Sequence, residues 1–310
     1  MRICVTGGTG FIGKMLVRRL LAEDHQVRVL ARSSPRADGL KAQGAEIVPG
    51  DVSDDAALDS AAKDAELVFH AAAKVAGSGS LEEFTDVNVN GTQRVFDACL
   101  RQRVRQVVYL SSVAVYGIVK EDKAIDESTP FDGNPEGRDF YSRSKIAADQ
   151  LVISYSKKHD LPTAILRPGI VFGPGKPLPV ALLGGRLGQT NIVFGSPNHR
   201  FPLNYVENLV DALLLSMTPS GDLLRQYIVL DDDDLTLGQY HSAKSDADLT
   251  RTVFLPGWLV LLGGPLGGIP RHQVQRALQD RHYSTRLIRE DLGWSPRIGL
   301  KEAIGRTQRR

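Results

Sequence analysis

A short strand that runs directly into a glycine-rich turn constrains this chain more than any other feature. The apolar run Ile3–Val5 leads into TGGTGFIG, Thr6 to Gly13, and an amphipathic helical pattern follows. Glycine permits a tight turn, lets the backbone approach a pyrophosphate, and allows the helix to pack closely on the strand. The amides at the start of such a helix point at the phosphates. The stretch therefore predicts a dinucleotide site, with cofactor contacts at Gly7, Gly10, Phe11 and Ile12.

The first half of the chain alternates between strand-like and helix-like stretches. The expected strands are Ile3–Thr6, Gln26–Ala31, Glu46–Val48, Leu67–His70, Gln106–Ser111 and Thr163–Arg167. The expected helices are Phe11–Ala22, Ala56–Ala62, Val89–Leu100 and one that begins near Phe140. Strands separated by helices require right-handed crossovers. We therefore predict an α/β fold with a Rossmann-type, doubly wound parallel sheet.

After Pro168 the pattern changes. Glycines and prolines crowd Gly169–Gly188, and the elements expected beyond them are helices over Asn208–Met217, Ser284–Asp291 and Lys301–Thr307 and a strand over Gln226–Leu230. We predict a dinucleotide-binding domain over residues 1–168 and a smaller substrate lobe over residues 169–310, with some later segments returning to the sheet. The four acids Asp231–Asp234 are expected in a solvated loop. Adjacent side chains do not converge on one ion, so no metal site is predicted there.

Composition narrows the expected partners and compartment. The net charge of the 310 residues is only +2, which argues against a nucleic-acid partner. Cys4 and Cys99 offer no disulfide framework, and with no signal peptide in view they indicate the cytoplasm. Residues 253–270 carry no charge but hold three prolines and five glycines. We expect them to line an apolar pocket rather than to span a membrane, with peripheral membrane contact as a minor alternative.

The end of the second strand bears on the choice of cofactor. Arg32 follows Ala31 with no acid beside it, whereas an acid there would bind the 2′-hydroxyl of NAD. A guanidinium forks onto a phosphate, so Arg32 favours NADP, with NAD as the alternative. Asp51 and Val52, after the third strand, are expected at the adenine ring. Asp51 either accepts a hydrogen bond from the exocyclic amine or caps the next helix.

A tyrosine and a lysine lie four residues apart in YSRSK, Tyr141 to Lys145, and so share one helical face. A free phenol has a pKa of about 10, and a nearby ammonium lowers it. The lysine also reaches the nicotinamide ribose. Upstream, the fifth strand ends in SSVAVYG, where a hydroxyl can bond the substrate oxygen. These groups together suit hydride transfer at a carbinol carbon.

In their order along the chain, these motifs resemble those of the extended short-chain dehydrogenases/reductases. The matching stretches are TGGTGFIG, GDVSD (Gly50–Asp54), HAAA (His70–Ala73), NVNGT (Asn88–Thr92), SSVAVYG (Ser111–Gly117), YSRSK, LRPGIVFGPG (Leu166–Gly175), YVENLVDAL (Tyr205–Leu213) and LGWSP (Leu292–Pro296). The resemblance implies that Ser112, Tyr141 and Lys145 are catalytic, with Ser111 as the neighbouring candidate for the serine. It also implies a structural role for Asn88.

The resemblance further implies the surroundings of the site. Cofactor contacts are expected at Ala71, Ala72, Lys145, Pro168 and Ile170. Substrate contacts are expected at Ser111, Ser112, Tyr141 and Gly169. Members of this family often dimerise through two helices, which here are Glu82–Leu100 and Phe140–His159, so a homodimer is expected.

The catalytic residues do not separate oxidoreductases from sugar-nucleotide epimerases and dehydratases, which recycle the hydride. Gly169 follows Arg167-Pro168 where sugar-nucleotide members usually carry an Asn that holds the diphosphate. YVEN, Tyr205–Asn208, is close to the YVDN of the 3β-hydroxysteroid dehydrogenase and dihydroflavonol reductase branch. Loop packing is the alternative explanation of both features.

These features and the uncharged residues 253–270 favour an NADP(H)-dependent oxidoreductase that interconverts a ketone or aldehyde and an alcohol on a fairly apolar small molecule. The first alternative is a sugar-nucleotide epimerase or dehydratase with a tightly held cofactor. A catalytically inactive NADP-sensing regulator is disfavoured, because such proteins typically lack the tyrosine that is present here as Tyr141.

Overall fold

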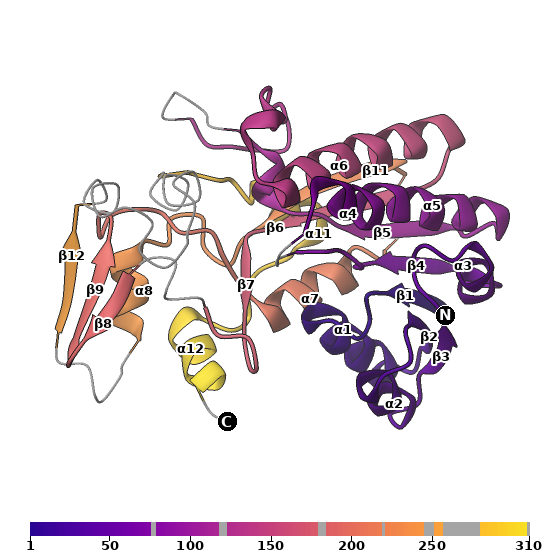
Figure 1. The fold of residues 1–310 in the computed structure, drawn as a ribbon, viewed down its shortest axis with the longest axis horizontal. Coiled ribbons are helices and arrows are strands. Elements are labelled where there is room, and N and C mark those ends of the chain that lie inside the picture. The colour runs from indigo at the N-terminus through magenta and orange to yellow at the C-terminus, as the bar shows by residue number, and fades with distance from the viewer. Residues whose placement is uncertain are drawn as a thin grey trace.

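Seven parallel strands form the main sheet of the computed structural model, which describes residues 1–75, 79–117, 123–178, 184–218, 221–244, 251–256 and 280–308 (Figure 1). In spatial order they are β3 (Glu46–Pro49), β2 (Gln26–Ala31), β1 (Arg2–Thr6), β4 (Leu67–His70), β5 (Gln106–Leu110), β6 (Thr163–Pro168) and β11 (Leu224–Val229). All neighbouring pairs run parallel. This is the Rossmann order extended by β11, so the predicted α/β fold is confirmed.

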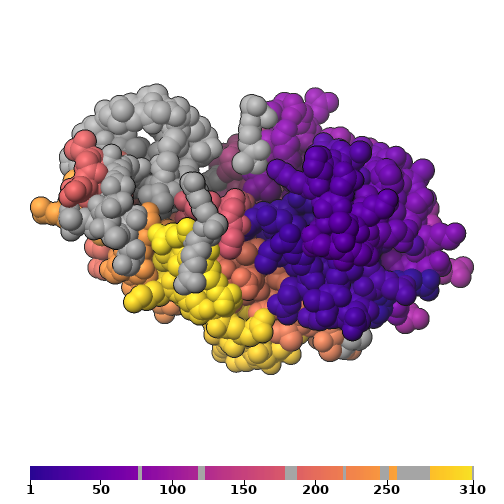
Figure 2. Space-filling model, turned by 90° about the horizontal axis from the view of Figure 1, so that it is seen from below, coloured from indigo at the N-terminus to yellow at the C-terminus, as the bar shows by residue number. Residues whose placement is uncertain are grey.

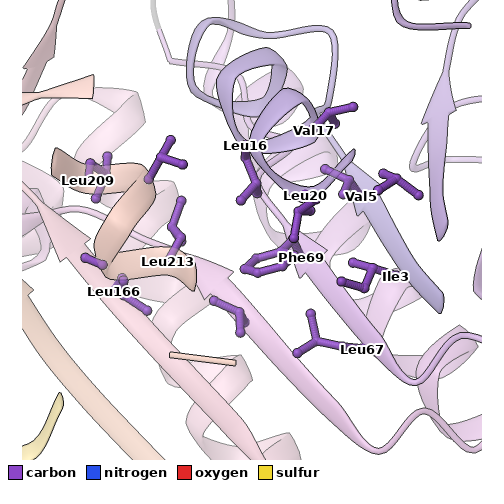
Figure 3. Close-up of a cluster of buried hydrophobic side chains, with 14 of the residues drawn as sticks. Ile3, Val5, Leu16, Val17, Leu20, Leu67, Phe69, Leu166, Leu209 and Leu213 are labelled. Carbon is purple, nitrogen blue, oxygen red and sulfur yellow. The ribbon is translucent and has the colours of Figure 1, made fainter. Parts of the chain in front are cut away.

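Helices cover both faces of the sheet and create two hydrophobic cores. One core lies under α1 (Phe11–Ala22), α2 (Pro35–Lys41), α7 (Val206–Leu215) and α11 (Arg286–Leu292). The other lies under α3 (Asp55–Ala62), α5 (Gly91–Arg101) and α6 (Phe140–His159). Successive strand side chains point to opposite faces. Ile3 and Val5 therefore enter the first core, shown in Figure 3, and Cys4 enters the second.

Two α-helical segments of the first 168 residues differ from the sequence prediction, and α8 (Leu237–Ala243) beyond them was not predicted either. α2 was not predicted, although Ser34 accepts a hydrogen bond from the Ala37 amide and Pro35 begins the helix, both of which are helix-start signals. The helix predicted over Val89–Leu100 is part of a longer one. It runs from α4 (Leu81–Thr85) through a π-helical turn at Asp86–Asn90 into α5. Such π-turns are frequent at functional sites.

Beyond the main sheet the described elements are short. β7 (Ile170–Phe172) pairs with β10 (Leu203–Tyr205), and a separate sheet contains β8 (Gly184–Leu187), β9 (Thr190–Phe194) and β12 (Arg251–Leu255). α8 (Leu237–Ala243) packs against this small sheet, and α12 (Leu300–Gln308) lies near the C-terminus (Figure 1). Later segments also join the main body, since β11 extends the sheet and α7 contacts α1. We call the region of β8, β9, β12 and α8 the small lobe.

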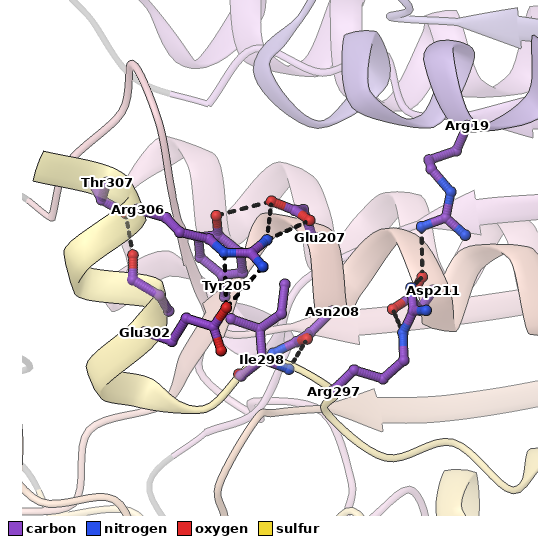
Figure 4. A network of polar contacts seen from close by, with 11 residues as sticks. Arg19, Tyr205, Glu207, Asn208, Asp211, Arg297, Ile298, Glu302, Arg306 and Thr307 are labelled. Carbon is purple, nitrogen blue, oxygen red and sulfur yellow. Dashed lines mark hydrogen bonds and ion pairs between the residues drawn. The ribbon is translucent and has the colours of Figure 1, made fainter. Parts of the chain in front are cut away.

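Ion pairs on α7 connect the C-terminal segments to the main body. Asp211 of α7 pairs with Arg19 of α1 at 2.9 Å and with Arg297 at 2.6 Å (Figure 4). Glu207, one turn earlier, pairs with Arg306 of α12 at 3.1 Å. Figure 2 shows the C-terminal segment, in yellow, between the orange residues and the indigo N-terminal residues.

The prediction that Asp231–Asp234 form a solvated loop was wrong for Asp231 and Asp233. The Asp231 carboxylate accepts the Tyr205 amide at 2.7 Å and the Asn208 side-chain amide at 3.0 Å. Asp233 accepts both the amide and the hydroxyl of Thr285. Acids of this run therefore accept hydrogen bonds from different segments of the chain, which composition alone does not reveal.

Among the described residues, no helix has the length and apolar character needed to cross a membrane. The uncharged segment 253–270 lies outside the described residues from position 257 onward, so its predicted role as a pocket lining or membrane contact stays a prediction.

Candidate active site

The glycine turn lies at the carboxyl end of β1, beside β4, where the strand order reverses. Gly7 has a φ of +73°, and a Cβ there would lie 2.6 Å from the backbone of Ala71 and Ala72. Only glycine fits such a position. Gly10 is the N-cap of α1 and brings no side-chain cap, so the first amides of α1 keep their hydrogen-bonding capacity. The turn therefore fits the diphosphate of a dinucleotide.

The residues expected at the adenosine end contact each other. The Arg32 guanidinium lies 3.6 Å from the Asp51 carboxylate, and 84% of the Arg32 side chain is exposed. Asp51 also accepts the Ser53 amide at 3.4 Å. Asp51 does not cap the next helix, because the side chain of Asp54 accepts the Ala57 amide at the start of α3. A carboxylate thus lies beside Arg32, although none is near it in sequence.

The other expected cofactor residues border the same edge of the sheet. Phe11 is half-buried at the start of α1, and Ile12 packs against the first core. Val52 is buried beneath Gly91, the first residue of α5. Pro168 ends β6, and Ile170 begins β7 with 36% of its surface exposed. The positions are compatible with a dinucleotide that crosses the carboxyl ends of the strands.

The start of α6 positions the tyrosine. Asp139 is the N-cap, and its carboxylate accepts the Ser142 amide at 2.9 Å. Two residues into the helix, the Tyr141 hydroxyl is hydrogen-bonded to Ser112. The Ser112 oxygen in turn accepts the Ala114 amide at 3.1 Å, which fixes the serine at the end of β5. The structure thus brings Ser112 and Tyr141 together.

Burial strengthens the preference of Tyr141 for its neutral form in this structure. Desolvation raises the pKa of Tyr141 to about 12, and the hydrogen bond from Ser112 opposes that shift. Lys145, whose ammonium donates to Tyr109 and Leu110, does not lower the pKa of Tyr141 here. Tyr141 is therefore a neutral phenol at pH 7.

Lys145 is 2% exposed and faces β5. Its ammonium donates to the Tyr109 hydroxyl at 2.8 Å and to the Leu110 carbonyl at 2.9 Å. Burial lowers the pKa of Lys145 to about 8, and the negative charge of Asp149 opposes the shift. Tyr109 was not predicted as a site residue. The sequence feature that could have identified it is its place on the buried strand that leads to Ser111 and Ser112.

A buried hydrogen-bond network connects Tyr109 to the glycine turn. Tyr109 is bonded to Thr92, whose oxygen lies 2.9 Å from Nε2 of His70. The Thr92 hydroxyl donates to the Asn88 carbonyl, so His70 carries its proton on Nε2. Nδ1 then accepts from the Thr6 hydroxyl at 2.7 Å. Burial lowers the pKa of His70 to about 3, which keeps it neutral.

Asn88 holds α6 against the loop after β4. Its side chain exchanges two hydrogen bonds with the Lys74 backbone, at 2.7 and 2.9 Å. It also donates to the Ser144 hydroxyl at 2.8 Å, directly before Lys145. Because Asn88 lies in the π-helical turn, that turn aims its side chain at both neighbours.

Ser111 belongs to a different cluster from Ser112. Its hydroxyl donates to the buried Asp149, which also forms an ion pair with Arg167 at 2.7 Å. Arg167 donates further to the Tyr116 hydroxyl at 2.8 Å and the Gln226 side chain at 2.7 Å. The Ser111 hydroxyl is thus engaged within the protein. Asp149 was not predicted, although it continues the stripe of Tyr141 and Lys145 by one more turn.

Gly169 is enclosed by its neighbours. A Cβ at this position would lie 2.3 Å from the Pro202 carbonyl oxygen and 2.7 Å from the Leu230 side chain. Its amide donates to the Asn204 side chain at 2.8 Å. No larger side chain fits here unless β7 and β10 separate, so packing does require glycine at this position.

A serine–tyrosine pair and a buried lysine, opposite a glycine turn on a Rossmann sheet, define the extended short-chain dehydrogenases/reductases, a class of NAD(P)-dependent enzymes. The chain belongs to the NAD dependent epimerase/dehydratase family, whose family model matches residues 3–228. The resemblance identified from the motifs is confirmed.

Relatives in the family carry several activities. The chain is 28% identical to a 2-alkyl-3-oxoalkanoate reductase of Stenotrophomonas maltophilia, over 99% of this chain and 98% of the relative. It is 30% identical to a UDP-glucose 4-epimerase of Mycolicibacterium smegmatis, over 99% and 97%. It is 25% identical to the 3beta-hydroxysteroid-dehydrogenase/decarboxylase isoform 2 of Arabidopsis thaliana, over 98% of this chain and 60% of that longer protein. It spans 63% of a Shewanella oneidensis 2-alkyl-3-oxoalkanoate reductase.

Solved structures agree on the fold. The crystal structure of gox2253 superposes with a TM-score of 0.80 at 24% identity, covering 99% of this chain and 96% of that one. The UDP-glucose 4-epimerase of Thermus thermophilus in complex with NAD superposes with a TM-score of 0.75 at 24% identity, covering 99% and 97%.

Proposed function

We propose that the protein is an NADP(H)-dependent oxidoreductase that interconverts a ketone or aldehyde and an alcohol on a fairly apolar small molecule. The Ser112–Tyr141 pair supplies the acid and base, and Lys145 lies on the same face of α6. The choice of substrate class is supported by the absence, after Arg167-Pro168, of the diphosphate-binding Asn that sugar-nucleotide members usually carry. Gly169 occupies that position, and its packing against Pro202 and Leu230 by itself also requires glycine.

The chemistry follows from the protonation of the site residues. When bound, NADPH supplies the hydride. In reduction, the Ser112 hydroxyl holds the carbonyl oxygen and Tyr141 protonates it. The pKa of Tyr141, about 12, keeps the phenol in its acid form at neutral pH. With the cofactor bound, Lys145 would hold the ribose hydroxyls, and its positive charge would then stabilise the phenolate that remains. In oxidation the same tyrosine is the base.

The preference for NADP rests on Arg32, with NAD as the alternative. The Arg32 side chain is exposed and can turn toward a 2′-phosphate, but its present partner is Asp51. Binding a 2′-phosphate at Arg32 requires the guanidinium to exchange Asp51 for the ligand.

The second candidate function is a sugar-nucleotide epimerase with a retained cofactor. It is favoured by the 30% identity to the Mycolicibacterium UDP-glucose 4-epimerase along nearly the whole length of both proteins. Gly169 argues against it, because another residue would then have to bind the diphosphate.

We also propose a homodimer formed through α4, α5 and α6, in a reducing, cytoplasmic compartment. The compartment is supported by Cys4 and Cys99, which are buried free thiols. Sedimentation velocity tests the dimer: a species of twice the chain mass supports it, and a monomer at micromolar concentration contradicts it.

Two measurements on the purified protein separate the candidate functions. Denaturation followed by chromatography shows whether a dinucleotide is retained in stoichiometric amount. Absorbance at the NADPH band is then followed with a panel of apolar ketones and aldehydes and, in parallel, with UDP-glucose. We expect an exchangeable cofactor and NADPH consumption with a ketone or aldehyde. A retained cofactor with conversion of UDP-glucose and no NADPH consumption contradicts the proposal.

A further inference from the structure

Ser112 and Tyr141, the two groups of the proposed acid–base pair, lie on separate elements. Ser112 begins a short loop that contains a 3₁₀ turn at Val113–Val115 and continues to Tyr116. We call Ser112–Tyr116 the serine loop. Tyr141 is the second residue of α6. The hydrogen bond between the two side chains therefore depends on how the serine loop is held against the start of α6.

Arg138 connects the serine loop to the segment that leads into α6. Its guanidinium donates to the Ala114 carbonyl at 2.8 Å and to the Tyr116 carbonyl at 3.0 Å. Arg138 lies directly before the N-cap of α6 and three residues before Tyr141. One side chain thus holds two carbonyls of the loop that presents the serine, from a position close to the tyrosine in the chain.

Asp132 orients the guanidinium of Arg138. The two side chains form a hydrogen-bonded ion pair, and only 7% of the Arg138 side chain is exposed. The Asp132 amide donates to the Val115 carbonyl at 3.1 Å, so the acid is attached to the serine loop as well. Loop, acid and arginine thus close a ring of hydrogen bonds, which holds the guanidinium in one orientation against the loop.

The ring uses the shape of the arginine side chain as well as its charge. Nη1 donates to the Tyr116 carbonyl and to Asp132, and Nη2 donates to the Ala114 carbonyl. A lysine carries all its donors on one nitrogen at the end of a flexible stem. It would keep the charge beside Asp132 but lose the rigid, planar fork. The charge and the fork of Arg138 can therefore be separated by substitution.

We propose that Arg138 is a positioning residue of the acid–base pair, which holds the serine loop where Ser112 can bond to Tyr141. The proposal rests on the proposed function, because it concerns the same site. Arg138 acts through the placement of Ser112 and not through the substrate. Since a misplacement of about 1 Å can cost about 100-fold in rate, loss of the fork should appear in turnover.

Two variants of Arg138 and one matched control separate positioning from stability. Arg138→Gln removes both the charge and the fork, and Arg138→Lys removes the fork alone. The control is Arg28→Lys. Arg28 likewise donates to a backbone carbonyl, that of Lys63, at 2.7 Å and pairs with the Glu46 carboxylate at 3.0 Å. Glu46 begins β3, so these contacts lie toward the amino ends of the strands, away from the proposed site.

Two readouts are used, and the second needs neither cofactor nor substrate. The first is kcat and the KM for NADPH with the carbonyl substrate that is reduced fastest. The second is the NMR signal of the phenolic carbon of Tyr141 in protein with isotope-labelled tyrosine, identified by its absence in Tyr141→Phe. Because this signal responds to the hydrogen bond with Ser112, it tests the positioning even if no reductase activity is found.

We expect Arg138→Lys to lower kcat about tenfold and Arg138→Gln about 100-fold, with little change in the KM for NADPH. The Tyr141 signal should shift in both variants. Arg28→Lys should match wild type in both readouts. If Arg138→Gln does not fold, Arg138→Lys alone decides.

The proposal is overturned if Arg138→Lys keeps the kcat and the Tyr141 signal of wild type, because the charge alone then suffices. It is also overturned if the Arg138 variants lose thermal stability without a change in either readout, which would make the residue purely structural. If no carbonyl substrate is reduced, a shifted Tyr141 signal still supports the positioning while the proposed function fails. An unshifted signal overturns the positioning itself.

Discussion

Two inward-facing carboxylates are stabilised in different ways. Asp149 lies on α6, the helix that carries Tyr141 and Lys145 and that we call the catalytic helix on the basis of the proposed function. Asp231 follows β11 and binds Tyr205 and Asn208, and we call this attachment of the later segments the junction. Asp149 is completely buried and forms an ion pair with the equally buried Arg167. Asp231 accepts hydrogen bonds mainly from neutral donors, the Tyr205 amide and the Asn204 and Asn208 side chains. Desolvation raises the pKa of Asp231 to about 7, and the more distant Arg289 lowers it only slightly.

This difference determines how each of the two regions responds to a change in pH. Under the catalytic helix, every polar group of the Asp149–Arg167 pair has a partner, and the pair fixes the ends of β5 and β6. At the junction, one carboxylate changes its charge near neutral pH. The attachment of the later segments is thus sensitive to pH near 7, and at the catalytic edge Lys145, with a pKa of about 8, responds at slightly higher pH.

The largest expected effect is a loss of turnover without a loss of stability. Tyr141→Phe removes the hydroxyl that we propose as the acid and base, so we expect kcat to fall about 100-fold or more. The control is Tyr155→Phe on the same helix, whose hydroxyl bonds to Asp97 at 3.1 Å, away from the glycine turn. Thermal stability and cofactor affinity should stay close to wild type in both variants. Full activity in Tyr141→Phe would contradict the assigned role.

Next in size is the effect of breaking the buried ion pair. Asp149→Ala leaves the Arg167 charge buried without its partner, which costs about 3–5 kcal/mol of unfolding free energy. The comparison variant is Asp59→Ala, which breaks the exposed pair with Arg101 and costs at most about 1 kcal/mol. Urea denaturation measures both. Equal losses of unfolding free energy in the two variants would show that burial does not increase the contribution of the Asp149–Arg167 pair to stability.

A smaller effect is expected from the residue that holds the lysine. Tyr109→Phe removes the hydroxyl bonded to Lys145, and we expect kcat to fall about five- to tenfold, in line with one buried hydrogen bond. Tyr109→Phe leaves Lys145 charged but no longer held in place. The pH profile of kcat should therefore shift as well. A change in stability with no change in kcat or its pH profile would leave Tyr109 a purely structural residue.

The last expected effect concerns the response of the junction to pH. The pKa of Asp231 is about 7 in the folded protein, against an ordinary value of 3.8, so the folded state binds this proton more tightly. Its contribution to stability is present at acidic pH and is lost as pH rises from about 4 through about 7. Asp231→Asn should flatten the Tm profile between about pH 4 and 7, whereas Asp232→Asn should not. Parallel profiles for wild type and Asp231→Asn would refute the assigned pKa.

Most of the fold could be predicted because its signals are local. The glycine turn, the apolar strands and the amphipathic helices of the first 168 residues each appear within a few residues of sequence. The small sheet of β8, β9 and β12 has no such signal, since its strands are short and β12 joins β9 from a distant part of the chain. The position of β11 beside β6 likewise depends on packing.

The site could be predicted only in part, for a related reason. Tyr141 and Lys145 are recognisable from their spacing, and Ser112 from the motif that follows β5. The contact between Arg32 and Asp51 joins the ends of two neighbouring strands, which no local pattern reveals. Tyr109 and Thr92 resemble ordinary buried residues in the sequence, and only the fold brings their hydroxyls into the network of Lys145 and His70.

The central claim is net hydride transfer from NADPH to a ketone or aldehyde, and isotopic labelling tests it most directly. The protein is incubated with NADPH that carries deuterium at the transferred C4 position and with the carbonyl substrate that consumes NADPH fastest. We predict that deuterium appears on the carbinol carbon, with one NADP⁺ formed for each alcohol. Deuterium that stays in the cofactor while UDP-glucose is epimerised would contradict the account and identify the retained-cofactor chemistry instead.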